Sequence, residues 1–90
     1  MNKRMFKNII NQAGIEIDLS DSDTLKPDTI KIFFRDGKYY VFKIDKNKEG
    51  FLIIETESEN RAYKEILKFF GIKLNHHGKM VESHKNEIRR

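Results

Sequence analysis

The sequence predicts an α+β fold: a three-stranded antiparallel β-meander with an N-terminal and a C-terminal helix packed on one face, in the order α-β-β-β-α. Two observations predict it. Residues 30–57 contain three runs rich in Ile, Phe, Tyr and Val, separated by Asp, Asn and Gly clusters, which is typical of strands joined by turns. On either side, at residues 3–13 and 62–70, apolar side chains recur at the spacing of one helix face.

The length and composition fit one small globular domain. The chain has 90 residues, of which 38% are hydrophobic and 36% charged. We therefore expect a single domain over residues 1–74 with a modest core. A basic polar tail follows over residues 75–90. We expect this tail to be frayed, with a helix from about residue 81 to residue 90 as the alternative.

Several classes of protein are disfavoured by composition. No apolar run approaches the roughly 18 residues that a membrane span needs. Lys7 and Asn8 interrupt the apolar residues of the basic N-terminus, so a secretory signal is not expected. The absence of cysteine excludes a disulfide framework and suits a reducing compartment. We expect a cytoplasmic protein without a membrane partner.

The two predicted helices carry signals at their ends. Gly14 supplies a left-handed stop for the first helix, and Gly71 does the same for the second. Thr56 and Glu59 have the spacing of a capping box, with Ser58 as the alternative N-cap. Each helix has one apolar stripe, formed in the first by Met5, Phe6, Ile9, Ile10 and Ala13 and in the second by Ala62, Tyr63, Ile66, Leu67 and Phe70.

The register of the first hairpin decides which residues face the core. A two-residue turn, Asp36-Gly37, would pair Arg35 with Lys38 and leave both faces mixed. A three-residue turn with a bulge at Gly37 would instead pair Phe34 with Lys38. That register makes one face wholly apolar, so we predict the bulged turn. The predicted core face then carries Ile30, Ile32, Phe34, Tyr40, Phe42 and Ile44.

The acidic segment before the first long strand resembles a metal loop only superficially. Residues 16–28 hold five acidic residues against one lysine, although the net charge of the chain is +4. Asp18, Asp21 and Asp23 could each supply oxygen to calcium, but the glycine and bidentate glutamate of a calcium loop are absent. We expect a solvated acidic loop, with a short extended piece around residues 15–17.

No catalytic or cofactor site is predicted. His76, His77 and His84 lie in the polar tail without the cysteine or spaced partners of a structural zinc site. The chain has no glycine-rich phosphate loop and no nucleophile motif. We therefore expect a protein that is not an enzyme and has no metal or cofactor.

Nucleic-acid binding is the alternative that the basic composition raises. The order helix, three strands, helix is that of the double-stranded-RNA-binding domain, whose second helix opens with phosphate-binding lysines. Here that position holds Glu57, Ser58 and Glu59, and the two glutamates would repel phosphate. Weak binding through the N-terminal cations and the tail remains the runner-up.

The pattern resembles a known class of binding proteins. A short amphipathic helix, a strand, the run from Arg35 to Phe42, a third strand, and Glu57 to Tyr63 leading into residues 66–70 are similar to small bacterial immunity proteins of polymorphic-toxin systems. The resemblance covers roughly residues 3–72. It implies a cytoplasmic, non-enzymatic protein that binds and neutralises a cognate toxin domain. Phage-encoded inhibitors of host defence proteins have similar small α+β domains and are the alternative.

A candidate partner surface follows from the predicted register. The sheet face opposite the helices would present aromatic and apolar side chains rimmed by lysines, and the acidic loop could also bind locally. An exposed apolar patch rimmed by charge often marks a protein interface. A homodimer formed through this face or through an edge strand is a second arrangement of the same kind. The alternative without a partner is that the residues after Gly71 fold back and cover this face. The candidate residues are Phe33, Tyr39, Val41, Lys31, Lys43, Asp18, Asp21 and Asp23.

Overall fold

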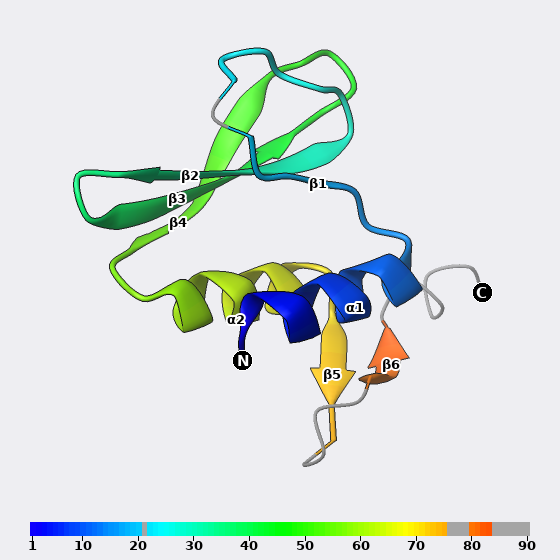
Figure 1. Ribbon diagram of the computed structural model, residues 1–90. Coiled ribbons are helices and arrows are strands. Elements are labelled where there is room, and N and C mark those ends of the chain that lie inside the picture. Colours follow the sequence, from blue (N-terminus) through cyan, green and yellow to red (C-terminus); the bar gives the residue numbers. More distant parts are fainter. Residues whose placement is uncertain (21, 76–79, 84–90) are drawn as a thin grey trace.

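The computed structural model describes residues 1–20, 22–75 and 80–83 of the chain, with side chains described as far as residue 75. Figure 1 shows its elements in chain order. They are α1 (Lys3–Ala13), β1 (Ile17–Asp18), β2 (Thr29–Arg35), β3 (Lys38–Ile44), β4 (Gly50–Thr56), α2 (Glu59–Phe69), β5 (Ile72–Leu74) and β6 (Met80–Ser83).

The main sheet is mixed and has four strands, in the order β1-β2-β3-β4. The predicted antiparallel meander is present as β2, β3 and β4. The prediction of three strands was wrong, because β1 adds to β2 in parallel through the pairs Ile17–Ile30 and Asp18–Lys31. The sequence showed an extended piece near residues 15–17 but gave no sign of its pairing. A parallel pair needs a long connection, and residues 19–28 supply it.

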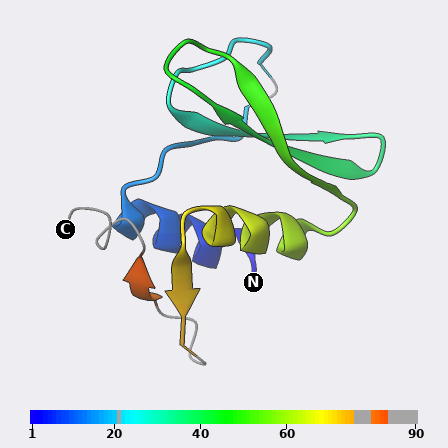
Figure 2. The ribbon, with the colours of Figure 1, turned by 180° about the vertical axis from the view of Figure 1, so that it is seen from behind.

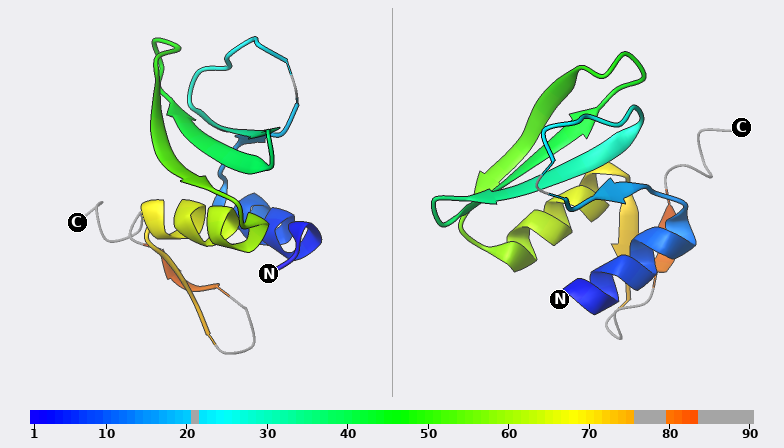
Figure 3. Two further views of the ribbon diagram at one scale, coloured as in Figure 1. Left: turned by 90° about the vertical axis from the view of Figure 1, so that its left-hand side faces the viewer. Right: turned by 45° about the horizontal axis from the view of Figure 1, so that its top comes forward.

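Both helices lie under the same face of the sheet, as predicted. Figures 1 and 3 show α1 and α2 side by side beneath the strands. The rings of Phe6 on α1 and Tyr63 on α2 stack with centroids 4.2 Å apart. Buried side chains of the two helices, the main sheet and β5 together form the hydrophobic core. They are Phe6, Ile9, Ile10, Ile30, Ile32, Val41, Ala62, Tyr63, Ile66, Leu67 and Ile72. The sheet face opposite the helices is called the far face below.

The predicted bulged hairpin turn is wrong. Arg35 pairs with Lys38, and the two turn residues have positive φ, 53° at Asp36 and 78° at Gly37. This is the primed two-residue turn that an Asp-Gly pair favours, because its twist matches that of the strands. The side chains of β3 therefore lie on the face opposite to the one that the bulged register assigned, whereas Ile30 and Ile32 of β2 are in the core as predicted.

The corrected register redistributes the apolar side chains over two faces. Val41 is fully buried against the helices, whereas Phe34 is 60% exposed. Tyr40 and Phe42, predicted in the core, pair with Phe33 and Lys31 on the far face. Ile44, also expected among the helices, is buried on the far face as well. The prediction of one wholly apolar face was wrong because this sheet has buried side chains on both of its faces.

A bulge in β4 settles which of its residues face the core. Val41 pairs with Ile54, but the next residue of β3 pairs with Leu52, so Ile53 is an extra residue in β4. Both Ile53 and Ile54 consequently pack against the core. Phe51 and Leu52 remain largely exposed on opposite sides of the strand. The alternation seen in the sequence therefore breaks in the middle of the strand.

Gly14 ends the first helix as predicted, and the second helix begins at Ser58, the alternative N-cap, so the capping box at Thr56 was wrong. The Asn2 side chain accepts a hydrogen bond from the Met5 amide at 2.8 Å, and Gly14 ends α1 in the left-handed conformation with φ 72°. Ser58 is the N-cap of α2 and accepts from the Arg61 amide at 3.1 Å. These side chains satisfy amide donors that a helix start leaves unpaired.

A short second sheet follows α2. Ile72 is buried beside α2 and begins β5, which pairs antiparallel with β6. The helical alternative for the tail does not hold at residues 80–83, which form a strand, and its remainder lies outside the described residues. No helix in the described part of the chain is long and apolar enough to cross a membrane.

Candidate protein-binding surface on the far face of the sheet

The structure divides the predicted partner surface between two faces. Tyr39, Val41 and Lys43 lie on the helix face, and Val41 and Tyr39 pack in or against the core. Phe33 and Lys31 lie on the far face. The expectation that these five residues share one surface is therefore wrong, and the two-residue turn is the reason. Of the acidic candidates, Asp18 and Asp23 also reach the far face, and Asp21 lies outside the described residues.

Lys31 is a buried charge with a full set of acceptors. Its side chain is fully buried, and its ammonium lies 3.0 Å from Asp18 Oδ2, 2.9 Å from the Ser20 carbonyl and 3.2 Å from Ser20 Oγ. The ammonium also lies 5.0 Å from the centre of the Phe33 ring. Three acceptors match its three N–H donors, which makes burial of the charge tolerable. Lys31 is thus a structural residue, and not an exposed lysine at the rim of a partner surface as predicted from the sequence.

Asp18 completes this cluster from β1. Its Oδ1 accepts hydrogen bonds from the Ser20 amide at 2.9 Å and the Ser20 hydroxyl at 2.8 Å. Burial acts to raise the pKa of Asp18, but the bonds from Ser20 and the charge of Lys31 outweigh it and lower the pKa to about 2. Both carboxylate oxygens of Asp18 are occupied within the chain, so its role is to hold the segment after β1 onto the sheet.

The segment held in this way forms one wall of a pocket on the far face. Asp23 from the β1–β2 connection lines the pocket together with four residues of β2 and β3, and its volume is about 330 Å³. From the sequence, the acidic loop and the aromatic strand were predicted to bind a partner separately. In the structure, Asp23 and Phe33 line the same pocket. The strand residues of the pocket are Phe33, Arg35, Tyr40 and Phe42.

Aromatic contacts fix the shape of this pocket. The rings of Phe33 and Phe42 meet edge to face with centroids 6.0 Å apart. The Arg35 guanidinium lies 5.8 Å from the centre of the Phe33 ring, within the range of a cation–π contact. Phe33, Tyr40 and Phe42 are only partly buried. The site therefore combines three half-exposed rings with one cation and one carboxylate.

Sequence reasoning missed Arg35, Tyr40 and Phe42 as site residues. The wrong register placed both rings in the core and left Arg35 inside the turn. The signal that could have found them was the Asp-Gly pair itself, which favours the two-residue turn. That turn alone puts Phe33, Arg35, Tyr40 and Phe42 on one face.

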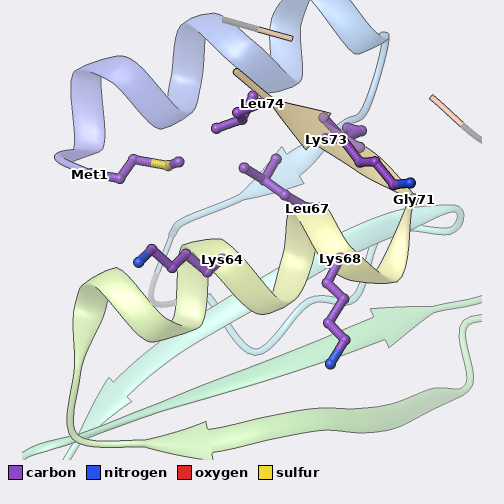
Figure 4. A pocket seen from close by; sticks show the side chains of 8 residues that line it. Met1, Lys64, Leu67, Lys68, Gly71, Lys73 and Leu74 are labelled. Atoms are coloured by element: carbon purple, nitrogen blue, oxygen red, sulfur yellow. The ribbon is translucent and has the colours of Figure 1, made fainter. Parts of the chain in front are cut away.

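A second hollow, of about 350 Å³, lies under the helices between the start of α1, α2 and β5. Figure 4 shows Met1, Leu67 and Leu74 directed toward one another, while the ends of Lys64 and Lys68 diverge. Its apolar floor is continuous with the core, since Leu67 and Ile72 are both buried. None of its lining residues is acidic.

The described residues contain no group of three or more His, Cys, Asp or Glu side chains that could hold a metal ion. The three histidines lie outside the part of the chain whose side chains are described. Burial, and then the 2.9 Å hydrogen bond to Glu59, raise the pKa of Tyr63, so its hydroxyl is a structural donor within α2.

Comparison with protein-family models, curated proteins and solved structures gave no match to this chain. The class of structure is a small α+β protein with an aromatic pocket on the sheet face opposite the helices.

Proposed function

We propose that this protein is a non-enzymatic protein-binding module and that its far-face pocket receives side chains of the partner. The observation that carries the proposal is the pocket formed by Asp23, Phe33, Arg35, Tyr40 and Phe42. Aromatic residues and arginine are the types most enriched at the centres of protein interfaces. Here they lie together on the sheet face that the helices leave open.

The composition of the pocket, and not its volume, supports a protein partner. Its volume of about 330 Å³ lies within the 300–1,000 Å³ range of small-molecule sites, but aromatic residues and arginine are the types enriched at protein interfaces. An aromatic hollow of this kind suits one or two large side chains of a partner. Arg35 and Asp23 then supply charges of opposite sign at its edge, which would fix the orientation of the partner.

The specific form that we propose is an immunity protein that binds and neutralises a bacterial toxin domain. This rests on the resemblance carried by the run from Arg35 to Phe42 and by the start of the second helix. Inhibition of a host defence protein by a phage protein is the alternative with the same binding mode. A cytoplasmic location is part of both proposals.

Nucleic-acid binding receives less support. The N-terminus of α2, where a phosphate would bind, is capped by the Ser58 side chain and flanked by Glu57 and Glu59. Negative side chains at this position occupy the site where a helix dipole would otherwise attract an anion.

The experiment is to identify the neighbouring gene, to co-express the full chain with any toxin domain that this gene encodes, and to measure growth and complex formation. Arg35→Glu reverses the charge at the pocket without touching the core, and we expect it to weaken binding at least tenfold. Lys46→Glu is the matched control, because Lys46 is an exposed cation in the β3–β4 turn. If the chain does not protect growth, the immunity role is wrong; if both variants bind like the parent, the pocket is the wrong site.

A further inference from the structure

The edge of the main sheet at β1 has open backbone groups. In the described part of the chain, β1 is the outermost strand and pairs with β2 alone. The amide of Ile30 donates to the carbonyl of Glu16 at 3.0 Å, so the backbone groups of Glu16 point toward β2. Neighbouring residues of a strand point these groups to opposite sides. The amide and carbonyl of Ile17 therefore point to the open edge, and no described residue bonds to either of them.

A groove of about 580 Å³ lies between this edge and α1. On the strand side it is lined by Ile15, Glu16, Ile17 and Leu19. Successive residues of a strand point their side chains to opposite faces, so a groove that is lined by consecutive residues follows the edge of the sheet. Figure 2 shows the chain turning back after α1 and returning above the helix through β1.

The groove offers apolar contacts and amide side chains together. Ile15, Ile17 and Leu19 alternate along the strand segment, and each is only half-buried against the core. On the opposite wall, Asn8 and Asn11 of α1 are exposed, and a side-chain amide can both donate to and accept from a peptide group. The lining contains a single cation, which makes it a poor site for a phosphate group. An extended peptide fits this combination.

The two walls carry free charges of opposite sign. Lys7 of α1 and Glu16 of the strand segment both line the groove and are exposed. Neither forms an ion pair with a described residue. The amide of Ile15 donates to the carbonyl of Ile10 at 3.0 Å, where the strand segment leaves the helix. Since the segment runs back along α1 from this contact, Glu16 lies near its start and Lys7 lies toward its Leu19 end.

We propose that this groove binds an extended peptide segment of a partner protein, which adds to the edge of β1 as an antiparallel strand. In an antiparallel pair, one residue of the incoming strand exchanges both backbone hydrogen bonds with Ile17. Strand addition takes its affinity from such bonds and its specificity from contacts with alternate side chains. The matching segment has alternating apolar residues, an acidic residue on their N-terminal side beside Lys7, and a basic residue on their C-terminal side beside Glu16.

This groove is separate from the pocket of the far face, because the two have no lining residue in common. The proposal therefore goes beyond the proposed function and does not depend on it.

The first test is an NMR titration of the full chain with two synthetic peptides, both blocked at their ends. One has the sequence Glu-Val-Thr-Val-Thr-Val-Lys, and the other has Glu and Lys exchanged. We expect the first peptide to bind at least tenfold more tightly and to shift the amides of Asn8, Asn11 and Ile17. The double variant Lys7→Glu with Glu16→Lys changes only exposed side chains and should reverse the preference. Equal binding of the two peptides, a preference for the exchanged one, or no binding of either at millimolar concentration overturns the proposal.

The second test removes the outward backbone donor. Ile17→Pro deletes the amide that faces the open edge and keeps the bond between Ile30 and Glu16, because proline is tolerated at a sheet edge where its missing N–H would face solvent. We expect this variant to bind the first peptide at least tenfold more weakly. Ile17→Val keeps the amide and an apolar side chain, and as the matched control it should bind like the parent. A folded Ile17→Pro variant that also binds like the parent overturns the proposal. If Ile17→Pro does not fold, the charge exchange decides alone.

Discussion

At the scale of single residues, the ion pair between Asp18 and Lys31 decides how the far face is built. The pair joins β1 to β2 with a 3.0 Å contact, and both side chains are almost completely shielded from water. Burying two charges is costly, so such pairs occur where their remaining hydrogen bonds are satisfied. Here Ser20 supplies those bonds, and the segment that carries Asp23 is held against the aromatic strands as a result.

The low pKa of Asp18 predicts an acid-sensitive contribution to stability. Its pKa falls from an ordinary 3.8 to about 2 in the folded chain. A lowered carboxyl pKa stabilises the fold above the unfolded pKa, and this stabilisation is lost as the pH falls from about 4 to about 2. The expected loss is about 2 kcal/mol.

Urea unfolding at a series of pH values checks this expectation. Asp18→Asn, which cannot ionise, is the control: it should be less stable than the parent above pH 4, and the difference should shrink toward pH 2. A constant difference between the two proteins across this range would show that Asp18 does not titrate in this way.

At the scale of elements, the helices were predictable because the signals at their ends are local. Gly14, Ser58 and Gly71 mark helix ends through their own backbone or side-chain geometry; the two glycines lie where they were expected, and Ser58 was the alternative to Thr56 as the N-cap. The meander was predictable for the same reason. The pairing of β1 with β2 was not, because it depends on a contact between residues 13 positions apart, Asp18 and Lys31.

The hairpin shows where pattern reasoning fails. Assigning one inner face from alternation requires that the other face be exposed, and here Lys31 and Ile44 are buried on the far face. Turn chemistry at Asp36-Gly37 predicted the register better than hydrophobicity did. The prediction of the candidate site relied on the wrong register. It therefore included only Phe33 and Asp23 of the five residues that line the pocket.

Two substitutions distinguish the registers by stability. Val41 is fully buried and Phe34 is mostly exposed. Val41→Ala should therefore destabilise the fold by on the order of 2 kcal/mol, as other truncations in a packed core do. Phe34→Ala should change the free energy of unfolding by less than about 1 kcal/mol, since it loses only a contact with the Tyr39 ring.

Chemical denaturation of both variants measures these changes directly. The bulged register would reverse their order, because it places Phe34 in the core and Val41 outside. A larger loss in Phe34→Ala than in Val41→Ala would thus contradict the two-residue turn.

At the scale of the whole molecule, two of the lysines behind the basic balance of the chain are paired with carboxylates. The buried Lys31 is held by Asp18, and Lys38 lies 3.1 Å from Glu55. We expect no sub-micromolar complex with duplex RNA or DNA at about 0.15 M salt, because contacts through scattered lysines are weak and strongly salt-dependent.

Fluorescence anisotropy with labelled duplexes tests this expectation over a range of salt concentrations. Tight binding at about 0.15 M salt that depends on sequence or structure would reverse the order of the two proposed functions.

The central claim is that the far face of the sheet binds a protein partner. The most direct measurement is NMR chemical-shift mapping of the isotope-labelled chain during titration with a toxin domain that it is found to neutralise. The account predicts that the largest shifts fall on the amides of Asp23, Phe33, Arg35, Tyr40 and Phe42, which line the pocket. Shifts confined to the outer surfaces of α1 and α2, with the far-face amides unchanged at saturation, would contradict it.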